Sequence, residues 1–122
     1  MPRSRAQQLA AYQRRYRALA AQLTDIGYIT AGSITLRSTR CGSPNCRCHA
    51  DPPQLHGPYW QWTAKVRGKT VTRRLSESEA NLYKQWIGND RQLRAVLTQK
   101  RQIAAKATEL LMEEAKNKRA EV

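Results

Sequence analysis

The sequence contains no phenylalanine, few acidic residues and no long apolar run. With no Phe and an apolar fraction of 40%, the core must be small and built mainly from Leu, Ile, Val, Trp and Tyr. No run approaches the ~18 apolar residues that span a bilayer, and the amino-terminal residues have no apolar stretch like that of a signal peptide. We therefore expect a cytoplasmic protein in which residues 1–122 form a single small domain.

Acidic side chains are scarcest in the first two thirds of the chain. In total, 22 Lys and Arg against 9 Asp and Glu give a net charge of +13. Residues 1–76 hold 13 basic and 2 acidic side chains, whereas residues 77–122 hold 9 and 7. This excess favours a polyanionic partner. Asp51 is the only carboxylate between Asp25 and Glu77, so acid–base groups are scarce and we expect no enzymatic activity.

All three cysteines lie in one short segment, TRCGSPNCRCHADPPQLHGPYWQW, together with both histidines. An odd number of clustered thiols in a reducing compartment is unsuited to a disulfide framework and favours a metal site. Zinc prefers a tetrahedron of thiolate and imidazole ligands, and Cys41, Cys46 and Cys48 can supply three. The fourth is His49 or His56. We favour His56, because His49 adjoins Cys48 and is expected to point away from the ion.

A zinc ion bound in this way would join the end of one strand to the start of the next, which stabilises a small core. The alternatives are three reduced structural thiols, or a redox-active or nucleophilic cysteine. The second alternative requires a nearby base, and the segment offers none beyond the histidines.

Hydrophobic periodicity predicts an α+β fold with a helix on either side of a small antiparallel sheet. We expect an amphipathic helix over residues 1–27, with a capping box formed by Ser4 and Gln7 and a stop at Gly27. Its apolar residues recur at spacings of three and four. They are Leu9, Tyr12, Tyr16, Leu19, Leu23 and Ile26.

Residues 33–76 are expected to hold the metal loop and the sheet, with a strand over residues 33–40 and a β-hairpin over residues 59–75. A turn at Arg67-Gly68 would place Trp62 opposite Arg73, with the guanidinium stacked on the indole. In this register one face is apolar and includes Trp60 and Trp62, although Lys69 and Arg73 also fall on it. The other face is polar and basic.

A long helix is expected over residues 77–120, because this range contains no proline and only one glycine. Ser76 and Glu79 form a second capping box. We expect one apolar row along the helix, interrupted at Lys100. It comprises Trp86, Leu93, Leu97, Ala104, Ala107 and Leu111. Such a helix would form a helical hairpin or coiled coil with the first helix, a second copy of the chain or another protein.

The chain contains, in order, the motif C-G-x-P-x-C-x-C, a spacer, H-G-P-Y, a hairpin with G-K and a long charged helix. In this order of features it resembles an uncharacterised family of short bacterial proteins. That family is a domain of unknown function found near mobile genetic elements. The resemblance covers about residues 25–100 and implies a fold layout but little about activity. Cys41, Cys46, Cys48 and His56 fall on its motif positions.

The basic residues around the hairpin predict a surface that contacts nucleic-acid phosphates. The candidate contacts are Arg14, Arg15, Arg37, Arg40, Arg47, Tyr59, Lys65, Arg67, Lys69, Arg73 and Arg74. Of the aromatic residues, Tyr59 is expected to be exposed, while Trp60 and Trp62 pack in the core. We expect a non-enzymatic, zinc-containing DNA-binding accessory or regulatory protein that forms a homo-oligomer or binds a protein partner through its helices. The alternatives are an RNA-binding or ribonucleoprotein component, and a coiled-coil adaptor for an acidic protein.

Overall fold

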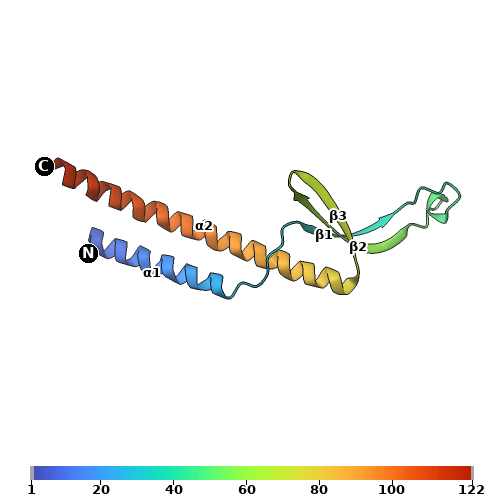
Figure 1. The fold of residues 1–122 in the computed structure, drawn as a ribbon, viewed down its shortest axis with the longest axis horizontal. Helices are drawn as coiled ribbons and strands as arrows, with labels where there is room; N and C mark the ends of the chain where they lie inside the picture. Colours follow the sequence, from blue (N-terminus) through green and yellow to red (C-terminus); the bar gives the residue numbers. More distant parts are fainter. Residues whose placement is uncertain (1, 122) are drawn as a thin grey trace. The chain divides into compact units, whose positions relative to one another are not determined.

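The computed structural model describes residues 2–121 and confirms the predicted α+β class (Figure 1). In chain order the elements are α1 (Arg5–Thr24), β1 (Ser33–Thr39), the short 3-10 helix η1 (Arg47–His49), β2 (His56–Val66), β3 (Lys69–Leu75) and α2 (Glu77–Ala120). No helix among the described residues combines the length and the apolar character needed to cross a bilayer.

Contacts divide the chain into two compact units. The helix unit comprises Met1–Gly27 and Arg91–Val122, and the sheet unit comprises Tyr28–Asp90. The long helix α2 contributes its first turns to the sheet unit and the remainder to the helix unit. That the whole chain folds as one domain stays a prediction.

Helix α1 begins at the predicted capping box and ends slightly earlier than expected. The Ser4 hydroxyl accepts a hydrogen bond from the Gln7 amide at 3.2 Å, and the Gln7 side chain accepts one from the Ser4 amide at 2.9 Å. The helix ends at Thr24 with Asp25 as its C-cap, so the predicted stop at Gly27 is wrong by three residues. The Ile26 amide already donates to the Leu23 carbonyl at 3.3 Å, which closes the last turn before the glycine is reached.

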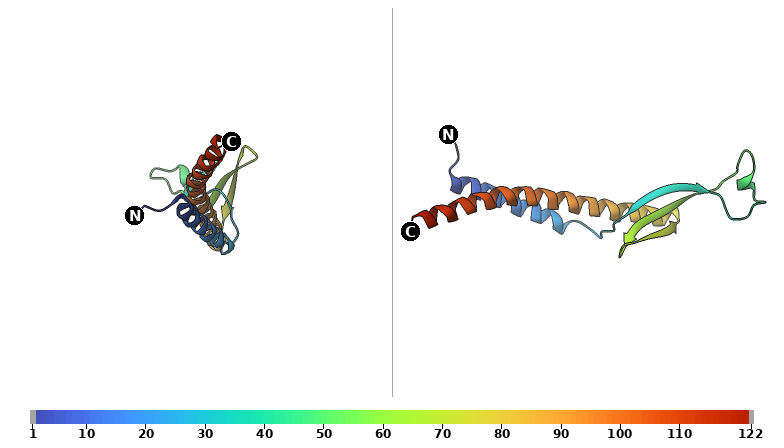
Figure 2. Two further views of the ribbon diagram at one scale, coloured as in Figure 1. Left: turned by 90° about the vertical axis from the view of Figure 1, so that its left-hand side faces the viewer. Right: turned by 90° about the horizontal axis from the view of Figure 1, so that it is seen from above.

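In the helix unit, α1 lies antiparallel beside the later part of α2 (Figures 1 and 2). Leu19 packs with Val96 and Ile103, and these three are the buried apolar side chains of this cluster. The predicted apolar row of α1 is confirmed at Leu19, with Tyr12 and Leu23 packed beside it. At the other end of the pair, Arg5 forms a salt bridge with Glu113 at 3.4 Å.

The residues of α2 that meet α1 lie one position before those of the predicted row. Val96 and Ile103 are buried with Leu19 of α1, whereas Leu97 and Leu111 of the predicted row are 36% and 49% exposed. That the predicted row packs against a second copy or another protein stays a prediction. Lys100 was expected to interrupt the apolar row, but it contacts Tyr16 of α1. Its ammonium group lies 4.2 Å from the centre of the Tyr16 ring, so the aliphatic stem covers apolar surface while the charge rests on the aromatic face.

In the sheet unit, the strands are antiparallel in the order β1-β2-β3. Arg67 and Gly68 both have positive φ, at 53° and 79°, as a two-residue type I′ turn requires. Trp62 therefore pairs with Arg73, as predicted, and the guanidinium carbon lies 5.8 Å from the centre of the indole.

The apolar face of the sheet packs against the first turns of α2. Trp62, Ala64 and Leu75 are buried with Ala80 and Ile87 of the helix. The predicted capping box at the start of α2 is confirmed: Ser76 Oγ accepts from the Glu79 amide at 3.2 Å, and the Glu79 carboxylate accepts from the Ser76 amide at 2.9 Å. These hydrogen bonds lower the pKa of Glu79. The first turns of α2 therefore cover the apolar face of the sheet and not its opposite, polar face.

Residues 28–32 are anchored by contacts that periodicity does not predict. The Trp62 indole N–H donates to the Ala31 carbonyl at 3.0 Å, and the Thr30 amide donates to the Trp86 carbonyl at 3.2 Å. The Asn89 side-chain amide donates to the Tyr28 carbonyl at 2.8 Å. The connection into β1 is therefore tied to both the sheet and the beginning of α2.

Gly32 is the tightest position in this connection, and replacing it with alanine should destabilise the fold. Gly32 has φ +115°, and a Cβ atom there would lie 2.6 Å from both the Thr63 carbonyl oxygen and the Trp62 indole nitrogen. We expect Gly32→Ala to lower the free energy of unfolding by ~2 kcal/mol or more. Gly88→Ala is the control with the opposite sign, because a Cβ at Gly88 meets nothing within 4 Å and alanine favours the helix by ~1 kcal/mol. Urea unfolding would measure both, and equal stability of the two variants would contradict the prediction.

Candidate metal centre and polar sheet face

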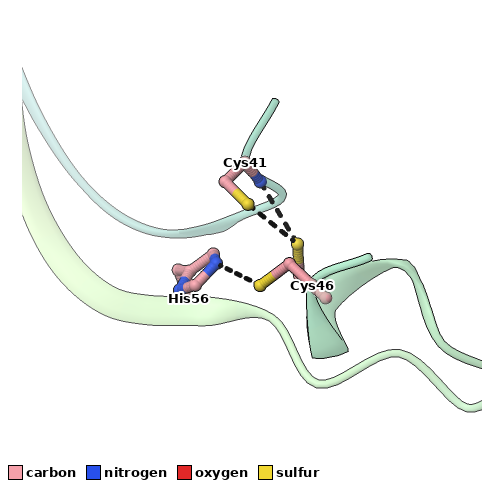
Figure 3. Close-up of side chains that lie close together, drawn as sticks. Cys41, Cys46 and His56 are labelled. Atoms are coloured by element: carbon pink, nitrogen blue, oxygen red, sulfur yellow. Dashed lines mark hydrogen bonds between the residues drawn. The ribbon is translucent and has the colours of Figure 1, made fainter. Parts of the chain in front are cut away.

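The candidate metal centre lies in the loop between β1 and β2. The pairing of Thr39 with His56 brings the ends of these strands together, after an irregularity in the register between Arg37 and Thr39. The loop then folds back through local hydrogen bonds. The amide of Cys46 donates to the Ser43 carbonyl at 3.1 Å, and the amide of Gln54 donates to the Arg47 carbonyl at 3.0 Å. These turns bring Cys41 and Cys46 together beside His56 (Figure 3), and Cys48 joins the same cluster.

The ligand atoms of Cys41, Cys46, Cys48 and His56 all lie within 4.8 Å of one another, which is close enough to bind a metal ion. The Cys41 and Cys48 sulfurs are 3.6 Å apart, and the Cys46 sulfur is 3.2 Å from His56 Nε2. With Zn–S bonds of ~2.3 Å, the sulfurs of a tetrahedral site are ~3.8 Å apart. The observed separations fit such a site with small adjustments. Cys48 is fully buried and Cys41 and Cys46 are half-buried, whereas His56 is exposed.

The two histidines have different positions in the loop. His56 Nε2 joins the sulfurs, as Figure 3 shows, whereas His49 Nε2 lies 2.6 Å from the Cys41 carbonyl oxygen. A histidine N–H that donates to the backbone of a ligand residue orients that residue without binding the ion itself. The preference for His56 therefore agrees with the geometry. The contact of His49 was not predicted, and only its position next to Cys48 hinted at it.

The electrostatics of the cluster favour thiolate. A hydrogen bond with the Cys48 backbone, followed by contacts with the Cys41 and Cys48 thiols, lowers the pKa of Cys46 to about 6. The Ser43 backbone lowers the pKa of Cys41, whereas burial raises that of Cys48. Hydrogen bonds with Cys41 and Cys46 raise the pKa of His56. The lowered pKa values of Cys46 and Cys41 favour the thiolate form, which is the form that binds a metal cation.

The basic residues predicted to bind nucleic acid are divided among several surfaces. Arg37, Lys65 and Arg74 lie on the polar sheet face, because their strand partners Tyr59, Thr70 and Gln61 point to the same side. The strands contain no acidic residue, and the remaining side chains of this face are uncharged. They are Ser33, Thr35, Tyr59, Gln61, Thr63, Thr70 and Thr72.

The other candidates lie elsewhere. Lys69 and Arg73 point to the apolar face, where Arg73 Nη1 donates to the Tyr83 hydroxyl at 2.9 Å. Arg67 occupies the hairpin turn. Arg40 and Arg47 belong to the metal loop, and Arg14 and Arg15 belong to the helix unit.

The aromatic residues of β2 are less accessible than a platform for base stacking requires. Tyr59 was expected to be exposed but is half-buried, because the Arg74 guanidinium lies 4.3 Å from the centre of its ring. The Tyr59 hydroxyl also donates to Thr39 Oγ1 at 3.4 Å. Trp62 is only 8% exposed, and the Lys84 ammonium lies 3.8 Å from the ring of Trp60. The predicted core role is confirmed for Trp62, and Trp60 is partly buried against the same cluster.

Comparison with known families shows to which family the chain belongs. Residues 9–84 match the family model DUF6788, described as a domain of unknown function. The chain belongs to the DUF6788 family. The match begins and ends earlier in the chain than the expected range of residues 25–100. No curated protein and no solved structure matches the sequence.

The DUF6788 region contains both features described above. It includes the four candidate ligands, all three strands and the first turns of α2. It ends at Lys84, before Val96 and Ile103, which α1 covers in the helix unit. The region also includes α1 from Leu9 onward, although the residues of α2 that α1 covers lie outside it. The metal loop and the polar sheet face lie wholly within the family region.

Proposed function

We propose that this DUF6788 protein is a non-enzymatic, zinc-containing DNA-binding accessory or regulatory protein. The observation that carries the proposal is the polar sheet face, which the first turns of α2 do not cover and whose strands contain no carboxylate. It presents Arg37, Lys65 and Arg74 among hydroxyl groups. Guanidinium, ammonium and hydroxyl groups are the side-chain donors that contact phosphate oxygens in nucleic-acid complexes.

The proposed ion is zinc, and its role is structural. Thiolates select soft or borderline ions, and three thiolates with one imidazole are a common structural zinc set. Four protein ligands leave no open position for a substrate or water. Asp51, the only carboxylate in the loop, is exposed, and His49 contacts the Cys41 carbonyl, so the loop offers no buried acid–base pair. The ion would instead hold the starting end of β2 to the loop that follows β1, which keeps the polar sheet face in register. Reduced thiols also suit the cytoplasm.

Duplex DNA is the proposed partner because of the shape of the surface. Beyond Thr63 the sheet continues as a two-stranded ribbon of β2 and β3, which carries Lys65. A two-stranded antiparallel ribbon fits the major groove. Single-stranded partners are usually held by exposed aromatic rings, and here Arg74 and Lys84 cover the rings of Tyr59 and Trp60. The excess of basic over acidic residues adds a binding term that does not depend on base sequence.

Fluorescence anisotropy tests the proposal. Binding is measured in parallel to duplex DNA, single-stranded DNA and double-stranded RNA of equal length, each over a series of salt concentrations. We expect duplex DNA to bind most tightly, with an affinity that falls steeply as salt rises, because cations are released from the phosphates. No binding at low salt would refute the nucleic-acid function. Tighter binding to RNA would replace DNA by RNA as the partner.

A further inference from the structure

The helix unit leaves much of its apolar surface uncovered. Among its described residues, Leu19, Val96 and Ile103 are the buried apolar side chains. By contrast, Leu97, Leu111 and Met112 are 36%, 49% and 54% exposed. A pair of helices that meet along one row cannot bury a wider apolar face, and such a face normally packs against further helices.

Beyond Asp90, α2 carries two neighbouring rows with the same spacing of three and four residues. The row that faces α1 includes Leu93, Val96, Lys100, Ile103 and Ala107. A second row follows one residue later in the sequence. It consists of Leu97, Arg101, Ala104, Thr108 and Leu111. A helix with two adjacent rows has two packing partners in a bundle, and α1 supplies only the first.

A groove runs beside this second row. Uncharged side chains from both helices line it. They are Leu9, Tyr12, Gln13 and Tyr16 of α1, and Ile103, Ala104, Ala107, Thr108 and Leu111 of α2. The small side chains Ala104, Ala107 and Thr108 leave room for the backbone of another helix to approach.

We propose that a second copy of this chain occupies the groove, with the two α2 helices antiparallel and a two-fold axis at Ala104. A symmetric dimer needs a surface that is complementary to itself. Leu97 and Leu111 are each seven residues from Ala104. The two-fold axis would therefore place Leu97 of one copy beside Leu111 of the other, with the two small Ala104 side chains at the centre.

The distribution of charge along α2 supports this orientation. Residues 91–103 carry Arg91, Arg94, Lys100 and Arg101 and no acidic residue. Residues 105–117 carry three acidic residues, Glu109, Glu113 and Glu114, against two basic ones, Lys106 and Lys116, and Glu113 also pairs with Arg5 of α1. An antiparallel pair places the basic segment of each copy along this nearly neutral, slightly acidic segment of the other, whereas a parallel pair would place the two strongly basic segments together. The proposed dimer does not depend on nucleic-acid binding.

Light scattering coupled to gel filtration tests whether the chain forms this dimer. It measures the mass of the protein in solution without nucleic acid. We expect twice the 13.9 kDa of one chain. Ala104→Glu should give the mass of one chain, because two carboxylates would meet at the axis. Ala105→Glu makes the same change one position further along the helix, at a more exposed residue outside the groove, and should remain a dimer. A single-chain mass for the unaltered protein at all concentrations would overturn the proposal.

A charge rescue separates loss of the interface from loss of the fold. Ala104→Lys should also be monomeric alone, but an equimolar mixture with Ala104→Glu should recover the dimer, since opposite charges then meet at the two-fold axis. Circular dichroism should show equal helix content in both variants. A mixture that stays monomeric while both variants remain folded would refute an axis at Ala104. Because no nucleic acid is present, this result would leave the proposed DNA binding untouched.

Discussion

Removal of zinc is expected to unfold the loop between Cys41 and His56 while the helix unit stays folded. Cys48 is the buried side chain of this loop, and the residues on either side of it are largely exposed. The loop therefore has little apolar contact to hold it without the ion. Structural zinc sites in small peptides bind with an apparent ~10–16 kcal/mol at neutral pH, and this energy is coupled to folding.

The experiment begins with zinc per chain in untagged protein, for which we expect a ratio near one. Chelator should then collapse the backbone amide resonances of the loop in a two-dimensional NMR spectrum, and added zinc should restore them. The helix unit is the internal control, because its core of Leu19, Val96 and Ile103 includes none of the ligands. Protein that contains no zinc and gives the same spectrum in chelator would rule out the metal centre.

Single substitutions distinguish the ligands from their neighbours. We expect Cys46→Ser and His56→Gln to weaken zinc binding by much more than ~100-fold, because each removes a bond to the ion. His49→Gln should cost only ~10- to 100-fold, the usual effect of losing a group that orients a ligand. Competition with a zinc indicator measures all three. An equal loss for His49→Gln and His56→Gln would contradict the proposed ligand set.

The features predicted correctly from the sequence are those for which residue spacing or turn chemistry allows only one local structure. The capping residues Ser4 and Ser76 placed both helix starts, because a side-chain oxygen followed three residues later by Gln or Glu satisfies free amides at a helix end. Arg67-Gly68 placed the hairpin turn, and the alternation along β2 then determined which side chains face α2. The metal ligands were identifiable because they are concentrated in one short segment.

The remaining features could not be predicted, for two physical reasons. Two rows on α2 share the same spacing, so periodicity alone could not decide that Val96, rather than Leu97, faces α1. A lysine in the buried row obscured the pattern further. The contacts of Asn89 and His49 end on backbone carbonyls, which every residue has, so no side-chain pattern reveals them. The sequence also could not show that Arg74 covers Tyr59.

Charge removal from the polar sheet face should weaken DNA binding, and the hairpin offers a matched pair of lysines for the test. Lys65 and Lys69 are both exposed and lie close to the turn, but they point to opposite faces of the sheet. Each Lys→Gln change removes one charge from the same hairpin. If the polar sheet face contacts the phosphates, only Lys65→Gln removes a contact.

We expect Lys65→Gln to reduce the slope of log affinity against log salt by about one unit, since each phosphate contact releases about 0.9 of a counterion from duplex DNA. Lys69→Gln should leave the slope nearly unchanged. The triple variant Arg37→Gln, Lys65→Gln, Arg74→Gln should lower the slope by about three units and remove most binding at physiological salt. Arg74→Gln alone also uncovers the Tyr59 ring, so its thermal stability should be recorded beside its affinity.

The pair of lysines also separates a binding surface from a general effect of charge. Long-range attraction between the chain and DNA depends on total charge, which the two substitutions change equally. Contact with phosphates depends on which face meets the DNA. Equal losses for Lys65→Gln and Lys69→Gln would therefore mean that the net charge attracts DNA without a defined sheet surface. A larger loss for Lys69→Gln would move the interface to the side of the sheet that packs against α2.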